Sequence, residues 1–284
     1  MKHSRLMPAI LAGAILIAAT SVAETFAISK AVSESEKQDM LRNDLTVLAL
    51  ERAQSVRNYV SNAEQRLIHF SKAAQVTDLL NDPKNKELAE KAQKYTEEIS
   101  KATAYVEGFY IADSNSTCLA HTNRQVVGIF IRNPETMNEL KRDMFAAGDG
   151  VYNSGIRFSP TTGKPLLFLY KAVCSEQGDL LGFVSHSMWA DPLMEGSRPN
   201  VKGAAHASYA MLDAKSGTYL LHSDNEMLGK APGIPEIKAL CSEVSQTKKS
   251  ASGTIDYQNC ADKYISAYSY IPEYGWLITL DAQL

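Results

Sequence analysis

The chain has 284 residues, of which 45% are hydrophobic, so it can bury one large core or two cores of about 100 residues each. Its 29 Lys and Arg residues are spread among 32 Asp and Glu residues, and the formal net charge is −3. This balance excludes the basic surface that nucleic-acid binding requires, and no nucleic acid is expected as a partner.

The N-terminal segment predicts export. Lys2 and Arg5 precede an uncharged run from Leu6 to Ala23, which as a helix would be about 27 Å long, barely the thickness of a bilayer core. The last three residues of that run, Ser-Val-Ala, also fit a signal-peptidase site. Residues 1–29 are therefore either an anchor or a cleaved signal. We favour an anchor in the inner membrane, with a periplasmic or extracellular domain, because a helical pattern continues from it.

A long amphipathic helix is predicted next. The stretch from Ser29 to Asp82 has neither Gly nor Pro, and its apolar residues recur mostly in steps of three and four, as they do on one helix face. Since fifty helical residues would span about 75 Å, we expect the membrane-near part to project as a stalk or to pair with a second copy. Pro83 ends this helix, which could be bent or interrupted, and a second helix is predicted from Lys86 to Ala104.

Two hairpins of one sequence pattern indicate a duplicated module. Phe109–His121 and Tyr209–His222 both begin with an aromatic residue, pass through Asp and a polar turn, and end in His, as β-hairpins do. Further strands with tight turns follow each copy. The predicted fold class is therefore α+β: a long N-terminal helix, then two modules, each an antiparallel sheet flanked by helices.

A connector rich in Pro, Gly, Ser and Asn, from Asp191 to Lys202, separates the two modules. We therefore expect residues 30–200 to form the long helix with the first module, and residues 201–284 to form the second. The second copy is the shorter one. We expect it to lack an insertion that the first copy carries between its hairpin and its last strands.

The four cysteines, Cys118, Cys174, Cys241 and Cys260, fall two in each module and have no metal-site spacing. In an oxidising compartment, one expectation is disulfide pairing within each module, 118–174 and 241–260; the other is four buried thiols. No Gly-x-Ser-x-Gly, His-Glu-x-x-His or P-loop pattern occurs. We therefore expect neither an enzyme nor a bound metal or cofactor.

The order of these elements resembles the double Cache (PAS-like) domains, the extracytoplasmic sensor regions of bacterial chemoreceptors, sensor kinases and diguanylate cyclases. The resemblance covers residues 30–284. It depends on the anchor and long helix, on the Asp213–His222 hairpin, and on the closing segment Ile271–Trp276. It implies a small ligand in the first, membrane-distal module and a homodimer.

The same resemblance implies a class of ligand. In the amino-acid-binding branch of the family, an Arg grips the ligand carboxylate and two acids hold its ammonium group. Arg142 matches the Arg, whereas Arg157-Phe158-Ser159 and Ser187 stand where the acids would be. This implies a small anionic ligand, with a carboxylate favoured over a plain α-amino acid. The expected ligand-binding residues are Arg142, Arg157, Tyr110, Phe145, Tyr170 and Ser187.

Alternatives stay open at this point. Arg142 could instead form a salt bridge with Glu139 and Asp143 on an exposed helix. The whole chain is interpreted as the sensing domain of a chemoreceptor-like transmembrane receptor; a secreted solute-binding protein, cleaved after Ala23, or an exported enzyme are the other readings. A receptor of this family would enter a second membrane helix near Leu284, so we expect either a fragment of a longer receptor or a sensor that acts through a partner.

Overall fold

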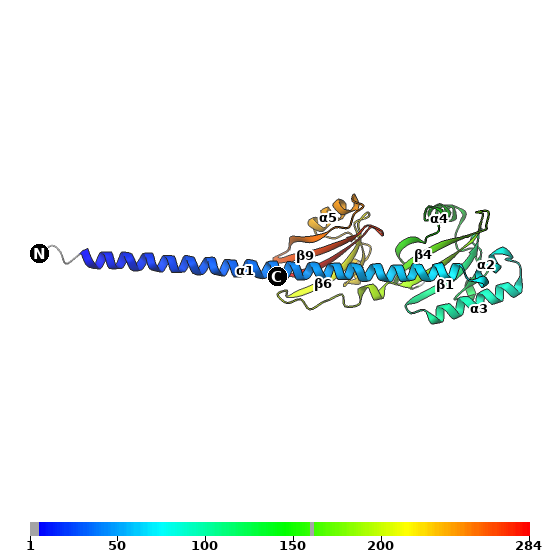
Figure 1. Ribbon diagram of the computed structural model, residues 1–284, viewed down its shortest axis with the longest axis horizontal. Helices are drawn as coiled ribbons and strands as arrows, with labels where there is room; N and C mark the ends of the chain where they lie inside the picture. Colours follow the sequence, from blue (N-terminus) through cyan, green and yellow to red (C-terminus); the bar gives the residue numbers. More distant parts are fainter. Residues whose placement is uncertain (1–5, 160–161) are drawn as a thin grey trace.

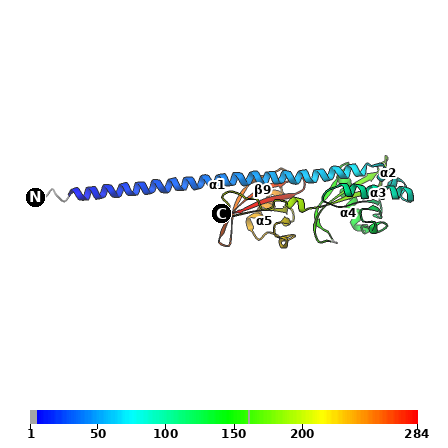
Figure 2. The ribbon, with the colours of Figure 1, turned by 90° about the horizontal axis from the view of Figure 1, so that it is seen from below.

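One helix organises the molecule. The computed structural model describes residues 6–159 and 162–284, with the side chains of Val32 and of residues from 34 onward. Helix α1 (Leu6–Ser71) runs for 66 residues, and two modules lie along its C-terminal part, both on the same side (Figures 1 and 2). The N-terminal part of α1 extends beyond the modules as a stalk (Figure 1). We call the module nearer to the N-terminus the proximal module and the other the distal module.

The distal module is a five-stranded antiparallel sheet with the strand order β2-β1-β5-β4-β3. Its strands are β1 (Val106–Asp113), β2 (Cys118–His121), β3 (Tyr152–Phe158), β4 (Pro165–Cys174) and β5 (Leu180–Trp189). Helix α1 covers one face of this sheet. Helix α4 (Pro134–Ala146) covers the other face, and its buried residues pack on Ala112, Tyr170 and Phe183.

The proximal module repeats this topology, with the order β7-β6-β10-β9-β8. Its strands are β6 (His206–Asp213), β7 (Thr218–His222), β8 (Ser252–Asn259), β9 (Asp262–Ile271) and β10 (Trp276–Gln283), and its helix is α5 (Pro235–Ser245). Identical strand orders make the two modules copies of one unit. The predicted fold class, α+β with two PAS-like modules after a long helix, is confirmed.

The predicted difference between the copies is wrong. Between its hairpin and its third strand, each module has one 3-10 turn, η1 (Arg124–Val126) or η3 (Asn225–Met227), followed by one helix, α4 or α5. The intervening segments, residues 122–151 and 223–251, are nearly equal in length. In both segments an extended stretch also lies along the edge of the sheet. The amide of Gly128 donates a hydrogen bond to the Cys118 carbonyl oxygen, and the amide of Gly229 donates one to the Tyr219 carbonyl oxygen. The proximal module therefore carries the same segment as the distal one.

The first predicted helix is interrupted near its end. Helix α1 ends at Ser71, Ala73 takes an extended conformation, and α2 (Ala74–Asn81) follows. The interruption contains neither Gly nor Pro, so local sequence does not explain it. Phe70, in the last turn of α1, is fully buried and stacks with Tyr95 of α3 (Lys86–Ala102) and contacts Phe109 of β1. The helix thus ends where its last aromatic residue enters the distal core.

The contacts of α1 join both modules into one core. Its buried apolar residues recur every three or four positions and belong to the same cluster as residues of both sheets: Leu41, Leu45, Ala49, Ala53, Val56, Val60, Ala63, Leu67 and Phe70. Polar contacts add to this packing. Arg42 forms two hydrogen bonds to the Asp256 carboxylate, at 2.7 and 2.6 Å, and the Tyr59 hydroxyl donates to the Trp189 carbonyl oxygen at 2.6 Å.

The predicted anchor, residues 1–29, lies outside the residues whose side chains the structure describes. Within the described part of the chain, no helix combines the length and the hydropathy that a membrane span needs.

The predicted disulfides are absent, and all four cysteines are free thiols. Cys118 lies on β2 and Cys174 on β4, with β1 and β5 between them. Three strand spacings place them about 14 Å apart, whereas a disulfide needs Cα atoms within about 7 Å. Cys241 is buried on α5, and Cys260 is exposed in the turn between β8 and β9. The alternative, four buried thiols, holds only for Cys118 and Cys241, because Cys174 and Cys260 are exposed.

We expect thiol chemistry to divide the cysteines into two pairs. A maleimide should modify Cys174 and Cys260 quickly in the native protein, and Cys118 and Cys241 only after denaturation. Burial raises the pKa of the Cys118 thiol to about 12 and that of Cys241 to about 11, and the thiolate is the reactive form. Peptide mass spectrometry would locate the labels. A disulfide-linked peptide, or a melting temperature that falls on reduction, would contradict the assignment.

His186 should make stability depend on pH. It is fully buried, stacks on Phe109 with 4.0 Å between ring centroids, and neither ring nitrogen has a hydrogen-bond partner. Burial, with a smaller contribution from nearby Arg66, lowers its pKa to about 3, although the backbone at Gly108 acts in the opposite direction. Below about pH 6.5 the histidine of the unfolded state binds a proton, whereas His186 in the folded state stays neutral. The free energy of unfolding therefore falls as the pH decreases from about 6.5 towards 3.

The test compares wild type with His186→Phe, which keeps the stack on Phe109. Between pH 7.5 and pH 5.0 the wild type should lose about 2 kcal/mol more of its free energy of unfolding than the variant, as measured by urea denaturation. Equal losses in both proteins would show that His186 is not held neutral in the fold.

Candidate functional site

A row of polar and aromatic residues crosses the distal sheet. Strand register sets one residue of each strand beside the next: His121, Tyr110, Ser185, Tyr170 and Tyr152. Residues directly opposite each other in antiparallel strands point to the same face. Because Tyr110, Tyr170 and Tyr152 all pack with the buried residues of α4, this row faces the space between the sheet and α4.

Arg132 lies over this row, in the loop just before α4. Its Nη2 donates to the Tyr170 hydroxyl at 2.8 Å, and its guanidinium carbon lies 5.0 Å from the centre of the Tyr170 ring. Its Nε is buried and has no hydrogen-bond partner. None of the ion pairs among the described residues involves Arg132. A partly buried guanidinium without a carboxylate is therefore present between sheet and helix.

Two cavities share Arg132. The first, about 570 Å³, lies between the β1–β2 turn and the start of α4, and contains Lys141 but no acid among its lining residues. The second, about 270 Å³, lies between α4 and β3, where Arg157 and Tyr152 face Glu139 and Asp143. The first cavity is thus lined by two cations, and the charges that line the second are balanced.

The start of α4 adds to the positive potential of the first cavity. Asn133 caps the helix by accepting a hydrogen bond from the Thr136 amide at 2.9 Å, and Pro134 occupies its first turn. Both residues line the cavity. The N-terminal end of a helix carries a partial positive charge and favours anions. The N-terminal end of α4, together with Arg132 and Lys141, therefore makes this cavity electrostatically favourable for a small anion.

Three of the predicted ligand-binding residues lie at this site. Tyr110 and Tyr170 belong to the cross-strand row, and burial raises the pKa of Tyr110 well above its usual value. Arg157 lines the second cavity. Ser187 lies farther along β5 and is buried, where it donates to the Glu107 carboxylate at 2.6 Å. Its hydroxyl therefore already has an internal partner.

The other two predicted residues point away from the cavities. The Arg142 side chain is 72% exposed and pairs with Asp143 at 2.9 Å, and Phe145 is 51% exposed. Helix α4 buries Met137, Leu140 and Met144, which lie on one face, and helical periodicity turns positions 142 and 145 outward. Arg142 and Arg157 therefore do not line one cavity. Instead, Arg142 forms the salt bridge to Asp143 on an exposed helix face that was the alternative interpretation.

Sequence reasoning missed Arg132 and Tyr152. Residues 126–132 fit either a further strand of the sheet or a loop over it, so their pattern alone does not single out Arg132. The signal that could have found it is its position immediately before the helix cap Asn133 and Pro134, since a loop that ends on such a cap lies over the sheet.

The equivalent row of the proximal module lacks two of the tyrosines. Its members are His222, Ala210, Thr279, Tyr268 and Gly253. Tyr110 and Tyr152 are thus replaced by Ala210 and Gly253. A Cβ at Gly253 would lie 3.1 Å from the Tyr268 hydroxyl, so Tyr268 occupies that space. The two modules share a topology but differ in the chemistry of this face.

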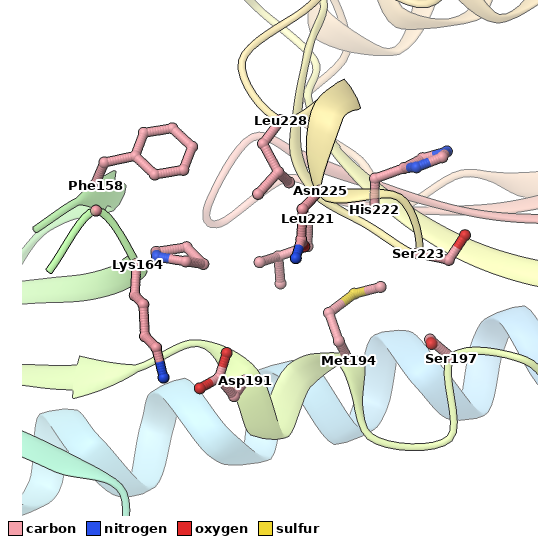
Figure 3. A pocket seen from close by; sticks show the side chains of 12 residues that line it. Phe158, Lys164, Asp191, Met194, Ser197, Leu221, His222, Ser223, Asn225 and Leu228 are labelled. Carbon is pink, nitrogen blue, oxygen red and sulfur yellow. The ribbon is translucent and has the colours of Figure 1, made fainter.

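A further cavity of about 630 Å³ lies at the junction of the modules. Figure 3 shows Phe158 and Lys164 of the distal module on one side of it and Leu221 and Leu228 of the proximal module facing them, with Met194 of the connector below. Because its walls come from both modules, its shape depends on how they are held together along α1.

Comparisons with solved structures show the same fold. The V. cholerae histidine kinase DctB sensor domain matches with a TM-score of 0.62 and 13% identity, over 88% of this chain and 99% of that one. The ligand-binding domain of the Pseudomonas aeruginosa amino acid chemoreceptor PctC, in complex with GABA, matches with a TM-score of 0.60 and 15% identity, over 85% and 99%. The ligand-binding domain of Mlp24 with asparagine matches with a TM-score of 0.57 and 13% identity, over 87% and 94%.

A comparison with curated proteins gives no significant match. The family model described as "Cache domain" (dCache_1) matches residues 28–283, from the long helix to the last strand. The resemblance to double Cache sensor domains is thereby confirmed. Since the match spans nearly the whole sequence and both modules, the chain belongs to the Cache domain family.

Proposed function

We propose that this protein is the extracytoplasmic sensing domain of a transmembrane signalling receptor, and that its distal module binds a small carboxylate at Arg132. The observation that carries the proposal is the buried Arg132 Nε without a hydrogen-bond partner, beside two cavities. A buried charged donor left unpaired costs about 1–3 kcal/mol or more. A carboxylate would satisfy it, because a guanidinium binds carboxylates through two parallel hydrogen bonds.

The relatives support this class of ligand. The ligands in the PctC and Mlp24 structures, GABA and asparagine, both carry a carboxylate. In this chain, Arg132 and Lys141 would hold that group in the first cavity. Tyr110, Tyr170 and Arg157 of the sequence-based prediction remain part of the proposed site. Arg142 and Phe145 do not, because they lie on the outer face of α4.

The same sheet offers a route for the signal. Strands β4 and β5 carry Tyr170 and Ser185 on the face towards α4, while their neighbours Leu169 and Val184 pack in the cluster that contains α1. A ligand that draws α4 against the sheet would therefore act on a strand pair whose other face packs on α1. Such a shift would bias a two-state helix position, as in other switching domains.

A homodimer along α1 belongs to this proposal. Large apolar side chains remain exposed on the helix at Val32, Met40, Val47 and Leu50, away from its buried stripe. A second copy of α1 would cover them. With residues 1–29 as an inner-membrane anchor, the two stalks would run side by side towards the membrane.

Carboxylate binding is the first test. In isothermal titration calorimetry with a panel of small mono- and dicarboxylates, at least one should bind the wild type, and Arg132→Ala should weaken it about 10- to 100-fold, since a hydrogen bond to a charged group contributes about 1.5–3 kcal/mol. Arg142→Ala is the matched control. It removes the same charge from the exposed face of α4 and should leave the affinity unchanged. Equal losses in both variants, or no binding by any carboxylate, would refute the site.

The N-terminus is the second test. If residues 1–29 anchor the protein, mass spectrometry of the chain recovered from bacterial membranes should find the N-terminal peptide intact. A mature chain that begins at Glu24, recovered from the soluble periplasm, would instead support a secreted solute-binding protein.

A further inference from the structure

The proximal module contains a cavity that the proposed carboxylate site does not use. It measures about 460 Å³ and is bounded by strands of the proximal sheet and by the segment between β7 and α5. Its lining includes Asp281, Asp224, His206 and His222, and it includes no Lys or Arg. It shares no lining residue with the two distal cavities. Its charge is thus opposite to that of the first distal cavity.

Asp281 is the group at this cavity that lacks a partner. It lies on β10, between β6 and β9, and strand register sets it opposite Ser208 and Ser266. The residue keeps part of its surface towards the cavity, but its Oδ1 atom is buried and has no hydrogen-bond partner, and neither has the buried Ser266 Oγ. An unneutralised carboxylate in such surroundings is unfavourable, so the fold keeps it there at a cost in stability.

The protonation of Asp281 reflects this cost. Burial raises the pKa of its carboxyl to about 6, although the nearby hydroxyls of Ser266 and Tyr257 lower it. The folded state therefore holds a proton that the unfolded state releases above about pH 3.8. Stability falls as the pH rises from there through 6, and at neutral pH the charged Asp281 destabilises the fold.

Aromatic side chains surround the carboxylate. The rings of Tyr257 and Tyr264 stack with 5.0 Å between centroids, and Tyr219 and His222 are in contact at 4.7 Å. All four line the cavity. A carboxylate beside aromatic rings is an arrangement that binds organic cations, which gain from both the charge and the ring faces.

The donor set fits an ammonium group better than a metal ion. Among the described residues, no group of three His, Cys, Asp or Glu side chains is placed to hold a metal. A primary ammonium has three N–H donors. Asp281 with the hydroxyls of Ser208 and Tyr257, which also line the cavity, offers acceptors for them.

We propose that the proximal module carries a second ligand site, which binds a primary organic ammonium at Asp281. This site goes beyond the proposed carboxylate sensing and does not depend on it. Its position also connects it to the long helix. The neighbours of Asp281 on β10, Leu280 and Ala282, point to the opposite face and are fully buried in the cluster that contains α1. An ammonium that neutralises Asp281 would therefore act on the strand that packs against α1.

The test is calorimetry on the full chain at pH 7.5 with butylammonium, 1,4-diaminobutane and tetramethylammonium. Butylammonium or 1,4-diaminobutane should bind the wild type, and Asp281→Asn should weaken that binding at least 10-fold. Tetramethylammonium has no N–H donors and should bind at least 10-fold more weakly than the better primary ammonium. Asp262→Asn is the matched control: it removes the same charge from an exposed residue of β9 that does not line the cavity, and it should bind as the wild type does.

Thermal unfolding separates lost binding from lost structure. Asp281→Asn should melt at a higher temperature than the wild type at pH 7.5, because it removes a buried charge. If that variant does not fold, Ser208→Ala, at the residue opposite Asp281 in the cavity, takes its place and should weaken binding several-fold. Wild-type affinity in the variant used, or no binding of any primary ammonium to the wild type, would overturn the proposal. Equal binding of tetramethylammonium, or loss of ammonium binding in Arg132→Ala, would do so too.

Discussion

The packing of α1 against both sheets is the constraint on which the rest of the structure depends. One stripe of the helix, from Leu41 to Phe70, is buried in a single core with strands of both modules. Exposing that face to water would be unfavourable for either sheet, because burial of each large apolar side chain contributes about 1.5–3 kcal/mol to the stability of the fold. The helix therefore serves as the common wall of the two modules.

Duplication supplied two sheets of one topology, and substitutions on one face then made them different. The face towards α1 is mostly apolar in both copies. On the opposite face the distal row carries Tyr110 and Tyr152, with Arg132 above it, whereas the proximal row carries Ala210 and Gly253. The proximal module holds its unpartnered charge elsewhere on that face, at Asp281. The two copies thus present opposite charges to their cavities while sharing one helix.

Prediction from sequence was accurate where periodicity carries the information. The existence of the helices, the repeated hairpins and the α+β class follow from spacings of three to four and of two residues, which local backbone geometry imposes. It was inaccurate where the answer depends on contacts between distant segments. The assignment of Arg142 to a pocket was wrong because the rotation of α4 is set by burial of Met137, Leu140 and Met144. Pairing Cys118 with Cys174 was wrong because two strands lie between theirs.

The sequence by itself determined that this is a long helix followed by two copies of a Cache module, because patterns of apolar residues and turns are local and recur in both copies. Only the tertiary structure decided which charged groups lack a partner. Arg132 and Asp281 look unexceptional in the sequence. Each becomes a candidate site because neighbouring strands and loops bury one of its polar atoms without satisfying it, and such burial is a property of the whole fold.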